Sequence, residues 1–222
     1  MIIMDMKSNE WLKHLINNLK ELDYIDPNDI PNIDLYMDQV TTFMDKHLAS
    51  SKRYTEDKLL TKTMINNYTK NNLLPSPNKK KYSKEHLLLL IFIYYFKNIL
   101  TINDIQTIFG PLTEKYFNGQ SEIGLEEIYK EVFSYEKDQV DTLIKDVIRK
   151  YNKSKESFSH VKSEEDKEFL NTFAFICMLS FDVYIKKQMI EQLIDTALTS
   201  KDKAKAPSEE KPKGKEKEKE KE

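Results

Sequence analysis

The chain has 222 residues, of which 32% are charged and 39% hydrophobic, and its formal net charge is −2. This length suits one or two small domains. The longest uninterrupted apolar run, Leu87 to Phe96, is about half as long as a membrane helix, so we expect no membrane protein. No apolar segment with a cleavage site follows Met1, and we therefore expect no signal peptide and a cytoplasmic location.

Residue types that carry chemistry are few and scattered. The single cysteine, Cys177, excludes a disulfide framework and a thiolate metal cluster, and its apolar neighbours favour a small packed hydrophobic residue. The histidines form no i, i+4 pair, and the chain has no nucleophile motif, glycine-rich phosphate loop or zinc spacing. We expect no enzyme, no catalytic residues, no metal site and no cofactor.

The near-zero net charge is an average over blocks of opposite sign. Residues 52–86 carry nine basic and three acidic residues, whereas residues 1–51 carry four basic and nine acidic ones. Residues 87–200 also have a net charge of −5, and the tail from 201 has +2. Clustered charge of this kind gives information about binding partners rather than about fold. It indicates residues 52–86 as the segment that would bind an anionic ligand.

In chain order, the first predicted helix covers Trp11 to Leu22, where apolar residues recur at helical spacing. The proline-containing segment Asp26–Pro31 ends it. Asp34 is a good N-cap for a second helix that reaches about Leu48, and Ala49–Lys58 is polar and predicts a loop.

A third, short helix is predicted to begin after the N-cap Thr61. Its apolar stripe consists of Met64, Ile65 and Tyr68. The remaining positions form an outer face rich in hydrogen-bond donors: Lys62, Thr63, Asn66, Asn67 and Lys70. The Leu-Leu-Pro sequence at 73–75 ends this helix.

Ser83 is the predicted N-cap of a helix that reaches about Asn98 and is apolar on every side, which is typical of a central buried helix. Thr101 and Asp104 form a capping box for a further helix that Gly110-Pro111 is expected to end.

The C-terminal half is also predicted to be helical. Helices are expected at 125–134 and 136–151, and a last helix opens at Ser163 and extends to about Leu198. A helix of that length exceeds what one small domain covers and favours packing against a second chain. The alternating Lys and Glu residues from Ser200 onward predict a disordered tail.

The segment from Thr61 to Phe109 resembles the DNA-binding domain of the MerR family of winged helix-turn-helix regulators. Three stretches carry the resemblance: Thr63–Pro75, which is similar to that family's recognition helix and its Leu-Leu-Pro exit; Lys80–Leu87, which is similar to Arg-x-Tyr-Ser-Glu-Glu-Asp-Leu; and Leu100–Ile105, which is similar to Phe-Ser-Leu-Glu-Glu-Ile. Asn72 stands where that family has a glycine. Ile33–Val40 and Leu60–Tyr68 also resemble a bacterial family of unknown function.

The resemblance implies an all-α fold with a MerR-like winged helix-turn-helix domain at 31–112. It is preceded by an N-terminal helix at 1–30 and followed by a helical, dimerising C-terminal region at 120–199 and the charged tail at 200–222. It also implies a cytoplasmic transcriptional regulator that binds double-stranded DNA as a homodimer.

Ten residues are candidates for DNA contacts. Asn66 and Asn67 can pair with adenine edges in the major groove, and five lysines with three hydroxyl-bearing residues can contact phosphates. These eight are Lys62, Lys70, Lys79, Lys80, Lys81, Thr63, Tyr68 and Tyr82.

Each reading has an alternative. Lys79–Lys81 can be a solvated turn, the asparagines plain helix surface, and the tyrosines loop anchors rather than phosphate contacts. The alternative for the whole chain is a helical protein–protein interaction adaptor that keeps a helix-turn-helix scaffold without binding DNA.

Overall fold

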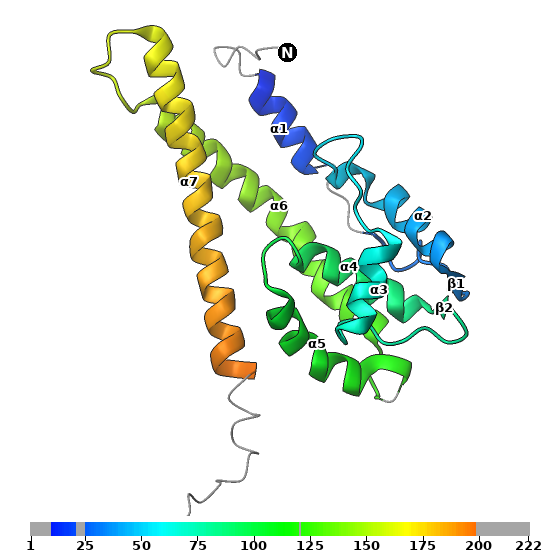
Figure 1. Cartoon of the computed structure of the whole chain (residues 1–222). Helices are drawn as coiled ribbons and strands as arrows, with labels where there is room; N and C mark the ends of the chain where they lie inside the picture. Colours follow the sequence, from blue (N-terminus) through cyan, green and yellow to red (C-terminus); the bar gives the residue numbers. More distant parts are fainter. Residues whose placement is uncertain (1–9, 21–24, 120, 199–222) are drawn as a thin grey trace, which may run out of the picture.

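The computed structural model describes residues 10–20, 25–119 and 121–198 of the chain (Figure 1). The end of the first predicted helix at 21–22 and the tail from Ser200 lie outside these residues. The fold is mostly helical, as expected. Its elements are α1 Glu10–Lys20, β1 Leu35–Tyr36, α2 Met37–His47, η1 Ala49–Ser51, α3 Lys62–Lys70, β2 Lys81–Tyr82, α4 Lys84–Phe96, α5 Ile102–Tyr116, η2 Phe117–Gly119, α6 Leu125–Lys155, α7 Glu164–Leu193 and the π-helical turn η3 Ile194–Leu198.

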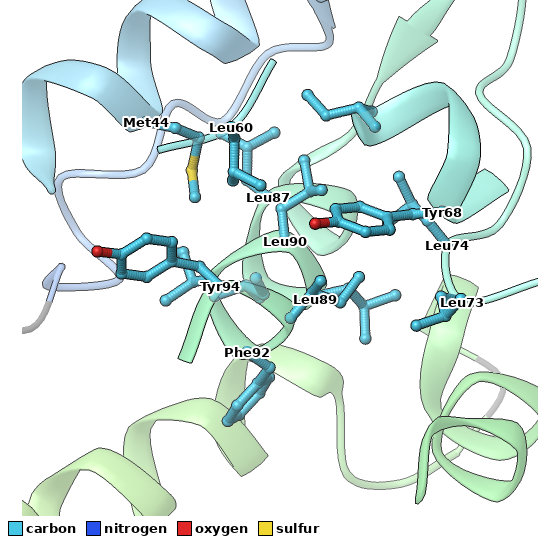
Figure 2. Packing of buried hydrophobic residues seen from close by; sticks show 14 of the residues in the cluster. Met44, Leu60, Tyr68, Leu73, Leu74, Leu87, Leu89, Leu90, Phe92 and Tyr94 are labelled. Atoms are coloured by element: carbon cyan, nitrogen blue, oxygen red, sulfur yellow. The ribbon is translucent and has the colours of Figure 1, made fainter. Parts of the chain in front are cut away.

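Helix α4 is the centre of the main hydrophobic core, as its apolar sequence predicts. Every side chain from His86 to Tyr94 is buried. Figure 2 shows Met44 of α2, Tyr68 of α3 and the Leu73–Leu74 exit arranged around it. On another side, the Phe92 ring lies 5.4 Å from Tyr129 of α6. Because α4 contacts its neighbours all round, it fixes α2, α3 and α6 relative to one another.

The short strands β1 and β2 pair antiparallel, with Leu35 opposite Tyr82 and Tyr36 opposite Lys81. They join the start of α2 to the segment before α4. The N-cap of α2 is Tyr36 and not Asp34 as predicted; its N–H donates to Gln39 Oε1 at 2.8 Å. Pairing with β2 keeps the chain extended up to Tyr36, so the helix begins after Tyr36 rather than after Asp34.

Helix α5 begins as predicted. Thr101 Oγ1 accepts from the N–H of Asp104, whose carboxylate accepts from the N–H of Thr101 at 3.0 Å. The predicted end at Gly110-Pro111 is wrong, because α5 continues through Pro111 to Tyr116. Phe109 before the proline is buried and Leu112 after it packs on the same core, so tertiary packing outweighs the lost hydrogen bond.

Helix α6 is continuous over 125–155, and the predicted break near residue 135 is wrong. No proline or glycine stands there. Ser134 Oγ donates to the carbonyl of Glu131 and Tyr135 Oη to its carboxylate, so both side chains bond within the helix. The core continues past the predicted boundary near 112–120, because Leu125 and Tyr129 belong to the same buried cluster as α4.

The far ends of α6 and α7 form a second, smaller cluster with α1. Leu12, Val147, Tyr151 and Phe175 are its buried members, and the Tyr151 and Phe175 rings lie 5.6 Å apart. Helix α7 begins at the predicted N-cap Ser163, whose hydroxyl accepts from the N–H of residue 166, and it extends to η3 at Leu198 as predicted.

By length and composition alone, Glu164–Leu198 is also long and apolar enough to cross a membrane, the one such helix in the described residues. One such helix is weak evidence for a membrane span; only 6% of its most apolar window is buried, so it differs from the mostly buried core helices that pass the same test. The expectation of no membrane helix rested on the length of uninterrupted apolar runs. That criterion does not detect this helix, because scattered polar residues divide its apolar sequence into short runs.

Candidate nucleic-acid interface

Helix α3 has one buried face and one polar, exposed face. Thr61 Oγ1 accepts from the N–H of Met64 at 3.2 Å and caps the helix, while Ile65 and Tyr68 are buried against α4 and its surroundings. The exposed residues are those that helical spacing predicted, namely Lys62, Thr63, Asn66, Asn67 and Lys70. They therefore share a solvent-facing surface on a helix that the core holds in place.

The exit from α3 is a tight turn. Asn72 has a φ of 55°, a left-handed conformation that asparagine adopts more readily than most residues. The N–H groups of Leu73 and Leu74 donate to the carbonyl of Tyr68 at 2.9 and 3.3 Å, and both leucine side chains are buried. The turn thereby ends the helix and anchors the chain before the basic segment.

The basic segment forms a hairpin turn over Asn78–Lys81. The N–H of Lys81 donates to the carbonyl of Asn78 at 2.9 Å, and the central residues Lys79 and Lys80 have φ of 48° and 66°. Two central residues with positive φ are typical of the tight turns that join twisted strands. Lys79 and Lys80 are exposed, whereas Lys81 is partly buried with its Nζ 5.2 Å from the centre of the Tyr36 ring.

Two of the candidate contacts, Tyr68 and Tyr82, lie mostly within the core. Tyr68 is 7% exposed and Tyr82 is 3% exposed, so their rings pack inside the fold rather than on the surface that the lysines and asparagines share. Burial raises the pKa of both phenols. Both tyrosines act as core anchors, the alternative reading of these residues. The sequence already indicated that Tyr68 is buried, because helical spacing places Tyr68 on the apolar stripe with Ile65.

The basic residues of the positive block differ in whether they are paired. Lys62 forms an ion pair with Asp38 of α2, and Lys84 reaches Glu126 of α6 at 2.9 Å. In the described part of the chain, Lys70, Lys79 and Lys80 form no ion pair. Among the ten candidate residues, these three are the cations that are both exposed and unpaired; in the described residues Arg53 and Lys58, in the loop before α3, are exposed and unpaired as well.

A groove of about 480 Å³ lies beside the start of α3. Thr41, Asp45 and Lys46 of α2 form one side, and the loop Lys58–Thr61 forms the other. The connection from η1 to α3, residues 52–61, also includes a turn in which the N–H of Tyr54 donates to Asp57 Oδ2 at 3.0 Å. The long connection between α2 and α3 is therefore an ordered part of the surface next to the exposed helix face.

His86 packs against Tyr82, the residue that directly follows the basic turn, a contact that the sequence analysis missed. Its ring packs between Tyr82 and Phe117, at 5.5 and 4.9 Å, and its Nδ1 accepts from the N–H of Ser83 at 3.0 Å. The spacing Ser-x-x-His was the available signal, because a residue three positions after an N-cap can return a hydrogen bond to it. Burial lowers the pKa of His86, and the backbone of Pro75 and Ser76 and the charge of Asp34 partly offset this.

We expect acid to destabilise the protein through His86. Its pKa is lower folded than unfolded, so its contribution is present above the unfolded value of about 6.5 and is lost as the pH falls below it. Urea unfolding of the wild type and of His86→Gln at pH 7.5 and 5.5 measures this effect. Glutamine keeps an acceptor for the Ser83 N–H without titrating, so the variant should lose less stability; equal losses would exclude His86 as the cause.

The comparison with protein families identifies one similarity. Residues 25–133, just under half of the chain, match the family model described as a domain of unknown function (DUF1836). No curated protein and no solved structure matches the chain. The matched segment begins before β1 and ends in α6, so it contains α3, the basic turn and the core that holds them. The expected similarity to a family of unknown function is thus confirmed, and the family's description assigns no activity.

Proposed function

We propose that this protein binds double-stranded DNA and acts as a transcriptional regulator. The observation that carries the proposal is the exposed polar face of α3, with the basic turn Asn78–Lys81 following it on the same core. An exposed helix fits the major groove, and a basic turn beside it can contact the phosphates of the same duplex.

The order of elements supports a MerR-like arrangement. A strand and α2 precede α3; the basic turn and β2 follow it; and α4 and the Thr-capped α5 come next. This is the order that the sequence resemblance implies for a winged helix-turn-helix. In the proposed arrangement α3 is the recognition helix and Asn78–Lys81 is a short wing.

The proposed contacts divide into two kinds. Lys70, Lys79 and Lys80 bind phosphates and supply most of the affinity, with Lys62, Lys81 and Thr63 as further donors. Asn66 and Asn67 face solvent on α3 and provide direct readout through bidentate pairing with adenine. Lys62 has to exchange Asp38 for phosphate, which reduces its net contribution.

Mobility shifts with genomic fragments at several salt concentrations test the proposal. Phosphate contacts by Lys70, Lys79 and Lys80 alone predict that the logarithm of the association constant falls with the logarithm of salt concentration with a slope of about −3 per bound chain, and contacts by Lys62 and Lys81 make the slope steeper. Binding to no fragment, or binding that salt does not weaken, would contradict DNA as the partner.

Replacing Asn66 and Asn67 with alanine should reduce specificity more than affinity. Each lost bidentate contact costs about 1–3 kcal/mol of discrimination between the preferred base and another, while phosphate contacts remain. Competition between an enriched fragment and unrelated DNA measures the difference. Asn152→Ala, at an exposed position of α6, is the matched control and should change neither quantity.

A second function, a protein-interaction adaptor, is favoured by one observation: the apolar side chains that α7 exposes, including Phe169 and Phe181. A pull-down with the full chain, repeated after nuclease treatment, separates the two functions. Partners that disappear with nuclease support DNA binding, whereas a stoichiometric protein that persists supports the adaptor.

A further inference from the structure

The groove beside the start of α3 is lined by three lysines. They are Lys46 near the end of α2, Lys58 in the connection from η1 and Lys62 at the start of α3. Lys62 pairs with Asp38, whereas Lys46 and Lys58 are exposed and form no ion pair among the described residues. Two free cations in one groove favour an anionic partner there.

A third free cation, Arg53, lies at the same end of α2. Its side chain is exposed, with the guanidinium 5.3 Å from the centre of the Tyr54 ring, and it has no ion pair in the described part of the chain. Lys52, the residue before it, reaches Asp45 of the groove at 2.7 Å, so the connection starts beside the groove. A guanidinium can bind a phosphate through two parallel hydrogen bonds, and Arg53 therefore extends the same basic surface.

The carboxylates of the groove and the connection each have a partner. Asp45 belongs to the ion pair with Lys52. Asp57 accepts from the N–H of Tyr54, and Glu56 accepts from the hydroxyl of the preceding threonine at 3.1 Å. The ion-paired residues cancel in charge, which leaves three free cations against two hydrogen-bonded carboxylates. The surface formed by the groove and the connection is therefore positive.

The connection is anchored in the core next to its cations. Leu59 and Leu60 are buried in the main core, and Lys97 Nζ donates to the carbonyl of Leu59 at 2.7 Å. Lys58 directly precedes this anchor, so its side chain projects from a backbone that is already in place, which lowers the cost of ordering it on binding. The lysines that line the groove are exposed, which suits a phosphate backbone lying across it better than an enclosed small molecule.

The groove and the basic turn lie at opposite ends of α2. The turn is attached at the start of the helix, where Lys81 Nζ lies 5.2 Å from the ring of the N-cap Tyr36. Lys46 follows ten residues later, about 15 Å along the helix axis. Figure 1 shows the β1–β2 pair at one end of α2 and the connection to α3 at the other. This separation is similar to the width of the major groove of DNA, about 12 Å.

We propose that the groove and Arg53 bind phosphates of the DNA strand opposite to the one that the basic turn contacts. This inference rests on the proposed DNA binding and deepens it, because it places one basic element on each side of the major groove that α3 enters. Phosphate contacts on both strands fix the orientation of a recognition helix. They would hold Asn66 and Asn67 in one register over the base edges.

The salt dependence of DNA binding by the full chain tests these phosphate contacts. Replacing Lys46, Arg53 and Lys58 with glutamine should make the salt slope shallower by about 3, because each lost contact removes roughly 0.9. Discrimination between an enriched fragment and unrelated DNA should not change, since the base contacts remain. The matched control replaces three exposed lysines of α6 and the following loop with glutamine and should keep the wild-type slope. These are Lys145, Lys153 and Lys162.

The outcomes separate this inference from the proposed function. A triple variant with an unchanged slope, beside a wild type that binds DNA, would overturn the second contact and leave DNA binding intact. A wild type that binds no fragment would overturn both. Arg53→Gln alone, at an exposed position outside the helices, is a second variant that cannot disturb α2 or α3 and should make the slope shallower by about 1.

Ethylation interference tests the placement on two strands. In the wild-type complex, the phosphates whose ethylation blocks binding should form two clusters on opposite strands across one major groove. The variant with glutamine at Lys46, Arg53 and Lys58 should lose one cluster, and a variant with glutamine at Lys79 and Lys80 should lose the other. Loss of the same cluster by both variants would assign the two basic elements to one strand and overturn the proposal.

Discussion

Replacing Lys79, Lys80 and Lys81 with glutamate is expected to abolish DNA binding. The change removes three positive charges from the hairpin turn and puts three negative ones in their place, next to the phosphates that α3 approaches in the proposed complex. The loss of phosphate contacts and the added repulsion act together, so we expect affinity to fall by at least about 100-fold at physiological salt. Mobility shift on the fragment with the highest wild-type affinity measures the effect.

A control with the same change of net charge separates local from general electrostatics. Lys145, Lys153 and Lys162 are exposed on α6 and the loop after it, far along the chain from α3. Their replacement with glutamate should leave most of the affinity intact. If both triple variants lose binding equally, the turn is not at the interface. Because Lys81 also packs over the Tyr36 ring, urea unfolding should verify that the first variant remains folded.

The helix starts were predictable from local chemistry. Thr61, Ser83, Thr101 and Ser163 each precede an apolar pattern and each is an N-cap in the structure. A cap satisfies backbone N–H groups within three residues of itself, so the sequence alone contains the whole interaction. The exposed face of α3 was predictable for the same reason, since helical spacing alone assigns its residues to two sides.

The errors concern effects that depend on tertiary structure. Pro111 weakens α5 locally, but the buried Phe109 and the partly buried Leu112 hold the helix on both sides of it. Asp34 is a good cap in isolation, but pairing with β2 keeps the chain extended to Tyr36. The pairing of Lys62 with Asp38 likewise joins two helices that only the folded chain brings together. The local propensities of these residues do not predict any of these contacts, because each contact depends on residues that only the folded chain brings together.

At position 72 the sequence departs from the family pattern, but Asn72 keeps the backbone conformation that the pattern requires there. The resemblance places a glycine at this position, and the structure has φ of 55° there. Asparagine adopts this conformation at a smaller cost than most residues, so the exit from α3 keeps its geometry without the glycine. Lys79 and Lys80 have no such preference, and their positive φ is imposed by the hairpin that places both on the surface.

Replacing Leu89 with alanine is expected to reduce the free energy of unfolding by about 2–5 kcal/mol. Leu89 is fully buried in α4, among the residues that Figure 2 shows between α2, α3 and α6. The loss combines the transfer energy of the removed carbons with the cost of a cavity that close-packed neighbours cannot fill. Urea unfolding at one fixed protein concentration measures it, since a dimer would make stability depend on concentration.

The matched control is Leu143→Ala, the same change at a position of α6 where the leucine is 43% exposed. It should cost less than about 1 kcal/mol, because little buried surface is lost and alanine favours a helix. Equal costs for the two variants would contradict a central role for α4. If the loss at Leu89 is large, DNA affinity should fall as well, because this core holds both α3 and the residues on either side of the basic turn.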